Sequence, residues 1–243
     1  PAGYHRYGRG MVAVVAGGMP GAACLAISAA VRWEAGYGIL LTDAPAHDIP
    51  KAVVQKPHVA LPEVLADKRL SAVVIGPGLG RDASARALLA QVRASGKPLM
   101  IDGDALHLLQ SDQSFSTPTI LTPHDGEFTA LFGASSGTKI ARARAAARQM
   151  NAVIVYKGAD TVIAAPDGRA RVATAGSAWL ASAGTGDVLA GLCGSSLARF
   201  PDLPLEAAET AVWLHAEAAR LAGPCLIADD LIAYLLAAAR AAL

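Results

Sequence analysis

Short apolar runs alternate with longer amphipathic stretches over the first half of the chain. Runs rich in Val, Ile and Leu have the length and composition of buried strands, and we expect strands at "MVAVVAGG", "YGILLT", "SAVVIG", "PLMID" and "TILT". Helical periodicity lies between them in "GAACLAISAAVRWEAG" and "DASARALLAQVRASG". Strands that alternate with helices predict an α/β fold, with a mostly parallel sheet covered by helices on both faces.

The pattern changes at residues 152–174, "AVIVYKGADTVIAAPDGRARVAT". Three strand-like pieces follow one another there, with turn signals at 158–160 and 167–168, which predicts a β-meander at one side of the sheet. After Asp187 the chain is expected to be helical almost to its end, with breaks at "FPDLP" and "AGPCLIADD". No linker, repeat or low-complexity tract divides residues 1–243, so the sequence predicts a single domain.

Composition narrows the classes of partner. The 21 Lys and Arg residues against 20 Asp and Glu leave a net charge of +1, which gives no broad basic field for nucleic acid or an anionic membrane. No uncharged run reaches the ~18 residues that a membrane span needs. Cys24, Cys193 and Cys225 lie far apart without a C-x-x-C pair, as in proteins of a reducing compartment. We therefore expect a cytoplasmic protein that binds small molecules.

Two strand-to-helix junctions carry candidate chemistry. "GPGLG" (Gly76, Gly78 and Gly80) follows a strand and precedes a helix, where backbone N–H groups can hold a phosphate. Its spacing matches neither G-x-G-x-x-G nor the Walker lysine loop, so a plain tight turn explains it equally well. In "IDGDAL", Asp104 is expected to cap a helix and Asp102 to face the crevice.

The segment "ILTPHDGEF" has the pattern of a capped helix. Thr122, Pro123 and Asp125 occupy the positions expected for an N-cap, an N1 proline and the acid of a capping box. That assignment leaves His124 and Glu127 unexplained. A histidine in a first helical turn at the carboxyl end of a strand is well placed to contact a ligand.

"ASAGTGDVLAG" places an acid directly behind two glycines at the start of a helix. The backbone N–H groups of Gly184, Thr185 and Gly186 would form an anion hole for phosphoryl oxygens. The helix dipole is expected to keep Asp187 ionised, so that it can accept the proton of a substrate hydroxyl that attacks phosphorus. For this motif alone, an acid that merely stabilises its own helix is an equally good explanation.

The order of the motifs is more specific than any one of them. "AGGMPGAA", "VIGPGLGRD", "IDGDALHLL", "LTPHDGEF", "YKGADTVI" and "AGTGDVLAG" together resemble the ADP-dependent NAD(P)H-hydrate dehydratases of the ribokinase-like superfamily, over residues 9–240. The resemblance implies a three-layer α/β/α fold and an enzyme that removes water from the S epimer of hydrated NADH or NADPH (NADHX or NADPHX) while ADP is converted to AMP. A plausible route is phosphorylation of the ring hydroxyl, followed by loss of phosphate.

The resemblance also implies roles for individual residues. Asp187 would be the catalytic base, and Glu127 would hold Mg²⁺ through water. The segment "KGADT" and the last glycine of the anion hole would bind ADP or AMP: Lys157, Gly158, Ala159, Asp160, Thr161 and Gly186. The hydrated dinucleotide would contact Ala22 or Ala23, Gly78, Gly80, His124 and Asp187. Relatives further imply a homo-oligomer, a tetramer, and an epimerase domain fused upstream.

The chain departs from the family in one loop. Many members have an Asn-Pro-Gly-Met-like run before the glycines, where this sequence has "GSAWLASAGTGD", with Ser177 and Trp179. Trp179 either stacks on a base or ring of the ligand or closes the core.

Two other functions are compatible with parts of the pattern. A ribokinase-like kinase for a hydroxymethylpyrimidine or thiazole alcohol would share Asp187 but prefer ATP; "LTPHDGEF" and "YKGADTVI" argue against it. A catalytically idle nucleotide-sensing module is disfavoured by the intact "GTGD".

Overall fold

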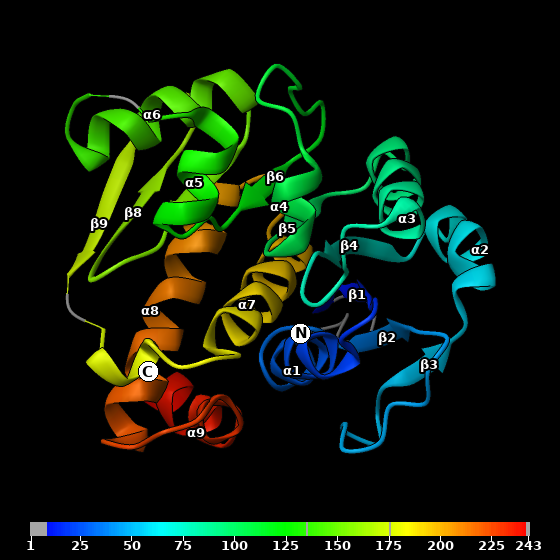
Figure 1. Ribbon diagram of the computed structural model, residues 1–243. Helices are drawn as coiled ribbons and strands as arrows, with labels where there is room; N and C mark the ends of the chain where they lie inside the picture. Colours follow the sequence, from blue (N-terminus) through cyan, green and yellow to red (C-terminus); the bar gives the residue numbers. More distant parts are fainter. Residues whose placement is uncertain (1–8, 135, 175, 242–243) are drawn as a thin grey trace.

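The structure is a computed structural model that describes residues 9–134, 136–174 and 176–241 (Figure 1). The centre of this described part is a sheet of nine strands in the order β3-β2-β1-β4-β5-β6-β7-β8-β9. Neighbours from β3 to β7 pair in parallel, whereas β8 and β9 are antiparallel. The predicted parallel sheet and meander are confirmed. The strands are β1 (Met11–Val15), β2 (Tyr37–Leu41), β3 (Val54–Lys56), β4 (Leu70–Ile75), β5 (Leu99–Ile101), β6 (Thr119–Leu121), β7 (Val153–Tyr156), β8 (Asp160–Ala164) and β9 (Ala170–Thr174).

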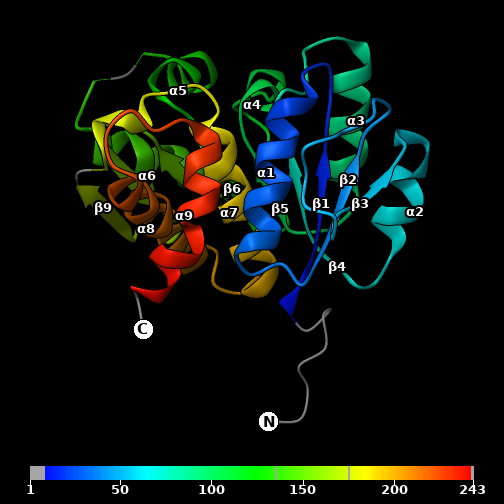
Figure 2. The same cartoon turned by 90° about the horizontal axis from the view of Figure 1, so that it is seen from below.

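Helices cover both faces of this sheet, as predicted. One face carries α1 (Pro20–Arg32), α7 (Thr185–Arg199), α8 (Pro204–Ala222) and α9 (Ala228–Arg240). The other carries α2 (Leu61–Ala66), α3 (Ala83–Ala94), α4 (Asp104–Leu108), α5 (Asp125–Phe132) and α6 (Lys139–Met150). Figure 2 shows α1 and α9, far apart in the sequence, side by side. The connections include the 3-10 turns η2 (His58–Ala60) and η3 (Ala178–Leu180).

Side chains alternate between the two faces along each strand, which explains the short apolar runs. On β1, Val12 and Val14 belong to the core beneath α1 and α7. Met11, Ala13 and Val15 belong to the core beneath the opposite helices. Since both faces are covered, all five residues of β1 are buried and the strand has no polar position. No helix in the described part of the chain is long and apolar enough to cross a membrane.

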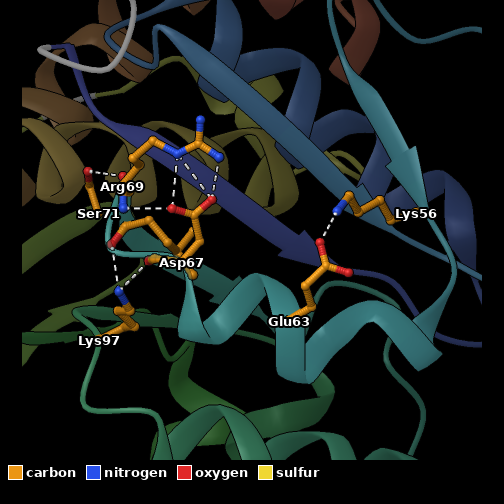
Figure 3. A network of polar contacts seen from close by, with 7 residues as sticks. Lys56, Glu63, Asp67, Arg69, Ser71 and Lys97 are labelled. Carbon is orange, nitrogen blue, oxygen red and sulfur yellow. Dashed lines mark hydrogen bonds and ion pairs between the residues drawn. The ribbon is translucent and has the colours of Figure 1, made fainter.

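Polar contacts fasten the amino ends of the central strands (Figure 3). The Asp67 carboxylate accepts from the Arg69 guanidinium at 2.7 Å, and Lys97 donates to the Asp67 carbonyl at 2.7 Å. Ser71 Oγ accepts the backbone N–H of Met11 at 3.2 Å and so ties β4 to β1. These bonds lie at the opposite end of the strands from the candidate chemistry, so we assign them to stability.

Helix α7 packs closely against α1 and the sheet through its glycines. A Cβ on Gly191 would lie 2.0 Å from the carbonyl oxygen of Ala26 in α1, and on Gly194 2.2 Å from a methyl carbon of Val74 in β4. The small residues of this helix therefore let it sink between α1 and the sheet. Since α7 begins with the Gly-Thr-Gly-Asp motif, this packing also fixes where Asp187 lies.

Gly191→Ala should lower the free energy of unfolding by about 2–4 kcal/mol, because the new methyl group meets backbone that cannot move aside. The matched control is Gly21→Ala, on the exposed side of α1, where a Cβ meets nothing within 4 Å among the described residues. That control should be neutral or stabilise by up to about 1 kcal/mol. Urea unfolding followed by circular dichroism measures both, and equal stability of the two variants would contradict this packing.

Candidate active site

A buried ion pair joins the carboxyl ends of β5, β6 and β7. Asp102, which follows β5, is 2% exposed. Its Oδ1 accepts from the Thr122 hydroxyl at 2.6 Å and from Lys157 Nζ at 2.9 Å. A Cβ on Gly186 would lie 3.4 Å from Lys157 Nζ and 3.9 Å from Asp102 Oδ2. The predicted nucleotide segment and the Gly-Thr-Gly-Asp motif therefore meet at this pair, and Asp102 lies beside that motif at the carboxyl end of β5.

The turn of residues 184–187, here called the anion turn, requires glycine at its first position. Gly184 has φ +85° and is the N-cap of α7. A Cβ at this position would lie 2.8 Å from Leu25 Cδ1 and 2.9 Å from Ala228 Cβ. The left-handed backbone and the close approach of α1 and α9 both exclude larger residues.

Thr185 fastens the anion turn to its surroundings. Its Oγ1 lies 2.7 Å from the Leu180 carbonyl, and its own carbonyl accepts from His215 Nε2 at 2.8 Å. Burial lowers the pKa of His215 to about 4, so the ring is neutral and its proton lies on Nε2. The first amides of a helix have no carbonyl of a preceding turn to pair with. Of the expected anion hole, the Thr185 N–H donates to the Ser182 carbonyl at 3.5 Å, whereas the N–H groups of Gly186 and Asp187 can hold an anion; the hole of Gly184, Thr185 and Gly186 stays a prediction.

The carboxyl group of Asp187 is half-buried, and its pKa departs from the expectation. Burial, with the nearby carboxylate of Asp102, raises this pKa to about 6, although Lys157 opposes the rise. Burial and like charge therefore outweigh the stabilisation expected from the helix dipole, but a pKa of about 6 still leaves the carboxyl of Asp187 mostly ionised at pH 7. A pKa close to the working pH suits a general base.

Lys157 stays charged despite its burial. Burial alone lowers the pKa of its ammonium, but the carboxylates of Asp102, Glu127 and Asp187 outweigh that effect and raise the pKa overall. Glu127 Oε2 lies 3.9 Å from Lys157 Nζ. A fixed positive charge therefore stands among the acidic residues, beside the anion turn, where it can offset part of the negative charge that a phosphate would bring.

Lys139 contacts the turn after β7 and the first two residues of β8 (residues 157–161, here called the β7–β8 turn), and no pattern in the sequence predicted this contact. Its Nζ donates to the Lys157 carbonyl at 3.2 Å and to Asp160 Oδ1 at 3.1 Å. It also lies 4.7 Å from the centre of the Tyr156 ring. The turn contains the predicted Gly158 and Ala159, and Thr161 Oγ1 donates to the Gly158 carbonyl at 3.3 Å.

Helix α5 begins later than predicted. His124, not Thr122, is the N-cap, and Asp125 is the first helical residue. His124 Nδ1 accepts the Glu127 N–H at 3.2 Å, and Glu127 Oε2 accepts the His124 N–H at 2.8 Å. Thr122 is not the cap because α5 begins at Asp125, three residues later; its hydroxyl instead donates to the carboxylate of Asp102. The roles expected for Pro123 and Asp125 in the cap are wrong because they depended on that earlier start of the helix.

The contacts of Glu127 leave little room for a metal role. One oxygen accepts the His124 N–H, and the other lies 3.5 Å from His124 Nε2. Residues 9–134, 136–174 and 176–241 contain no group of three His, Cys, Asp or Glu side chains that could hold a metal ion. Glu127 therefore belongs to no such group in the described residues; its water-mediated contact with Mg²⁺ stays a prediction, and no chemical step is assigned to the ion.

The "GPGLG" loop faces the start of α1. The Gly78 carbonyl accepts the Met19 N–H at 3.0 Å, and a Cβ on Gly78 would lie 2.2 Å from the Met19 carbonyl oxygen and 3.0 Å from Ala22 Cβ. Ala23 is 0% exposed and belongs to the core. Of the two alanines expected near the substrate, Ala22 is the one that borders this loop.

The contacts of Asp104 differ from those expected. The N-cap of α4 is Gly103, so the cap expected at Asp104 is wrong. The Asp104 carboxylate instead accepts the Gly80 N–H at 2.9 Å and Arg81 Nε at 2.8 Å. Because the Asp104 carboxylate already accepts the Gly80 N–H, a pyrophosphate could bind this N–H only by displacing the carboxylate.

Comparison with known proteins identifies the family. The model of the family described as NAD(P)H-hydrate dehydratase matches residues 12–234. The chain belongs to this family. It is 37% identical over 238 residues to the ADP-dependent (S)-NAD(P)H-hydrate dehydratase of Neisseria meningitidis, covering 88% of this chain and 78% of that protein. It is 38% identical to the bifunctional NAD(P)H-hydrate repair enzyme Nnr of Gloeobacter violaceus, covering 90% of this chain but only 46% of that protein. The chain thus spans about half the length of such bifunctional relatives.

Solved structures agree with the family and with the ribokinase-like fold. The ADP/ATP-dependent NAD(P)H-hydrate dehydratase of Bacillus subtilis, co-crystallised with ATP/Mg²⁺, superposes with a TM-score of 0.83 at 29% identity, covering 99% of this chain and 92% of that one. A ribokinase-like superfamily protein of Enterococcus faecalis gives 0.86 at 27% identity, covering 99% and 90%. A hydroxyethylthiazole kinase of Pyrococcus horikoshii gives 0.68 at 21% identity, covering 95% and 89%, which shows the fold alone. The dehydratase is therefore better supported than the vitamin-precursor kinase.

Because the pKa of Asp187 is raised in the folded state, we expect the stability of the fold to depend on pH. A carboxyl whose pKa rises on folding stabilises the fold most below its unfolded pKa, near 4, and this contribution is lost as the pH rises through about 6. Asparagine does not titrate. The free energy of unfolding of Asp187→Asn, measured relative to that of the wild type, should therefore rise by about 1–3 kcal/mol as the pH increases from 4 to 7.

Urea unfolding at a series of pH values measures this difference. The matched control is Asp160→Asn, because Lys139 lowers the pKa of Asp160 and the difference from wild type should then have the opposite sign. A difference for Asp187→Asn that does not vary with pH would show that the carboxyl is not destabilised by its surroundings.

Proposed function

We propose that this chain catalyses the ADP-dependent dehydration of the S epimer of NADHX or NADPHX, which restores NADH or NADPH and releases AMP and phosphate. The observation that carries the proposal is the position of Asp187 in the anion turn, next to the buried ammonium of Lys157. A base, an anion hole and a fixed positive charge are the groups that transfer of a phosphoryl group to a hydroxyl requires. Membership of the dehydratase family supports the same conclusion.

The reaction would proceed in two steps. In the first, Asp187 takes the proton of the ring hydroxyl, the ring oxygen forms a bond to the β-phosphorus of ADP, and the bond from that phosphorus to the bridging oxygen breaks, which releases AMP. The N–H groups of Gly186 and Asp187 and the ammonium of Lys157 stabilise the charge on the phosphoryl oxygens. In the second step the ring carbon–oxygen bond breaks, phosphate leaves, and the neighbouring ring carbon loses a proton, which forms the double bond.

The two substrates would occupy opposite sides of the Asp102–Lys157 pair. ADP would lie along the β7–β8 turn, with its phosphates at Gly186. The hydrated dinucleotide would lie across Ala22, the "GPGLG" loop and His124, whose side chain is 58% exposed. Mg²⁺ would arrive with the nucleotide phosphates, as suggested by the Bacillus relative crystallised with ATP/Mg²⁺, and no step is assigned to it.

The proposal extends to the organisation of the protein. We propose one ribokinase-like catalytic domain over residues 1–243, supported by the single sheet and the match at 12–234; residues 1–8, 135, 175, 242 and 243 lie outside the described part. A homo-oligomer, a tetramer, would bury the exposed Ile227, Tyr234 and Leu236. The free thiols of the three cysteines suit the cytoplasm. Partnership with an epimerase is supported by the bifunctional relatives.

Product analysis tests the activity. Incubation with the S epimer of NADHX and ADP should yield NADH, AMP and phosphate in equal amounts. Asp187→Asn should lower turnover on the order of 100-fold to 10,000-fold with little change in ADP affinity, because the amide keeps the shape but accepts no proton. Phosphorylation of a hydroxymethylpyrimidine or thiazole alcohol by ATP, with no NADH formed from NADHX, would establish the kinase instead.

Two substitutions separate the cap made by His124 from its proposed contact with the substrate. Asparagine is a good N-cap whereas alanine is not, so His124→Ala should lose about 1 kcal/mol of stability and His124→Asn little. If the imidazole contacts the dinucleotide, both variants should raise the Michaelis constant for NADHX and leave that for ADP unchanged. Normal kinetics in His124→Asn would reduce His124 to a helix cap.

A further inference from the structure

A histidine outside the site described above is bonded to the loop between β1 and α1 (residues 16–19, here called the first loop). His58 begins η2, which follows β3, and β2 lies between β3 and β1 (Figure 2). The His58 Nε2 lies 3.0 Å from the Ala16 carbonyl oxygen, 42 positions away in the chain. Because a carbonyl oxygen can only accept, Nε2 carries the proton of this bond. The bond therefore ties η2 to the carboxyl end of β1.

Asp43, in the loop after β2, holds the other side of the His58 ring. Its Oδ2 lies 3.0 Å from His58 Nδ1, and its Oδ1 accepts the His58 backbone N–H at 2.8 Å. The Asp43 carboxylate thus fixes both the backbone and the ring of His58. A ring with a proton on each nitrogen donates to Asp43 and to Ala16 at once, and the carboxylate balances its charge.

The bond from His58 fixes the direction of the peptide unit between Ala16 and Gly17. The Ala16 N–H donates to the Leu41 carbonyl of β2 at 2.9 Å, and the Ala16 carbonyl accepts from His58, so both groups point to the same side of β1. In a planar trans peptide the carbonyl and the N–H point in opposite directions. The Gly17 N–H therefore points to the other side of β1, where β4 and the "GPGLG" loop lie.

The first loop contacts the "GPGLG" loop on that side. A Cβ on Gly17 would lie 2.1 Å from the Leu79 carbonyl oxygen, so the two loops approach each other backbone to backbone. Gly18 is exposed, and a Cβ there would meet nothing within 4 Å among the described residues. Within the described part of the chain the Gly17 N–H donates to no other residue. This N–H is therefore available to a ligand.

We propose that His58 is a positioning residue for the dinucleotide: held by Asp43, it keeps the peptide between Ala16 and Gly17 turned so that the Gly17 N–H donates to the substrate. The proposal rests on the function proposed above, which places the hydrated dinucleotide across Ala22 and the "GPGLG" loop. His58 acts through the Ala16 carbonyl and not by contact with the substrate. Without the bond the peptide can turn away, because the two glycines that follow Ala16 allow many backbone conformations.

Paired substitutions of His58 separate its hydrogen bond from the bulk of its ring. Leucine has no donor, whereas glutamine places an amide N–H near the position of Nε2. His58→Leu should raise the Michaelis constant for NADHX and weaken binding of NADH in calorimetry, each on the order of 10-fold, the effect of one lost hydrogen bond. His58→Gln should retain most of the wild-type affinity. ADP binding should not change, because β4, β5 and β6 separate β1 from β7 and the turn to which ADP is assigned.

An exposed position tests the same contact without altering the packing of the ring. The Asp43 side chain is 65% exposed, so Asp43→Ala should fold even if His58→Leu does not. Because Asp43 holds the ring and not the loop, its loss should raise the same Michaelis constant less, roughly 3-fold, as for the loss of an exposed ion pair.

The matched control is Glu63→Gln. Lys56 donates to Glu63 Oε1 at 3.0 Å (Figure 3), so this change breaks an ion pair between β3 and α2, on either side of η2, and leaves the first loop untouched. NADHX kinetics, NADH binding and ADP binding should all stay at wild-type values. Urea unfolding of each variant shows which of them are folded.

Two results would overturn the role of His58. Unchanged NADHX kinetics and NADH binding in folded His58→Leu, or in Asp43→Ala if His58→Leu does not fold, would show that the loop keeps its shape without this contact. An equal loss of NADH and ADP binding that His58→Gln does not restore would mean that His58 only supports the fold. Both results leave the proposed function intact.

The proposed function fails separately. A wild-type protein that binds NADH but forms none from NADHX would overturn that function, while weaker NADH binding in His58→Leu would still support the role of His58. A wild-type protein that binds neither NADH nor NADHX would overturn both.

Discussion

The buried ion pair of Asp102 and Lys157 is the interaction on which the site depends. A carboxylate that is 2% exposed is costly unless it is paired and hydrogen-bonded, and here it accepts from both Thr122 and Lys157. These three residues end or follow β5, β6 and β7, so the bonds fix the ends of three adjacent strands relative to one another. Removing the carboxylate would leave a buried ammonium without its closest partner, and we expect that to disturb the site more than the loss of any one substrate contact.

The same pair sets the electrostatics of the anion turn. Its carboxylate, together with burial, raises the pKa of Asp187 to about 6, while its ammonium gives the turn a positive charge for phosphate. The carboxyl of Asp187 therefore destabilises the fold once it is ionised, and the tight packing of α7 against α1 holds it in place. A carboxyl that titrates just below neutral pH can take a proton from a hydroxyl during the reaction and release it afterwards.

Strong local patterns predicted most of the fold and the main groups of the site. The apolar runs gave the central strands, and the turn signals gave the meander. The three-residue β3, Val54–Lys56, was missed because it is too short and polar to show a pattern. Motif order led to Lys157 and Asp187, and the structure places both segments at one point. Whether each predicted contact forms with a ligand stays a prediction.

The predicted helix caps were wrong at positions where the side chain makes its hydrogen bonds with a residue that is distant in the sequence. Thr122 has the sequence pattern of a cap, but in the structure its hydroxyl donates to the carboxylate of Asp102, twenty positions away in the chain. Asp104 has the same pattern, yet its carboxylate accepts hydrogen bonds from the Gly80 N–H and from Arg81 Nε. Lys139 lies at the start of a helix without any local signal, and only the packing of the chain brings it to the β7–β8 turn.

Isotope tracing tests most directly whether the ring oxygen attacks phosphorus, as the position of Asp187 in the anion turn implies. NADHX labelled with ¹⁸O in the ring hydroxyl is converted with unlabelled ADP, and the released phosphate is analysed by mass spectrometry. If the ring oxygen is phosphorylated before the carbon–oxygen bond breaks, one ¹⁸O atom should appear in each phosphate. Unlabelled phosphate, with the label in water, would show that ADP cleavage and dehydration are separate events and would contradict the assignment of Asp187 as the base for phosphoryl transfer.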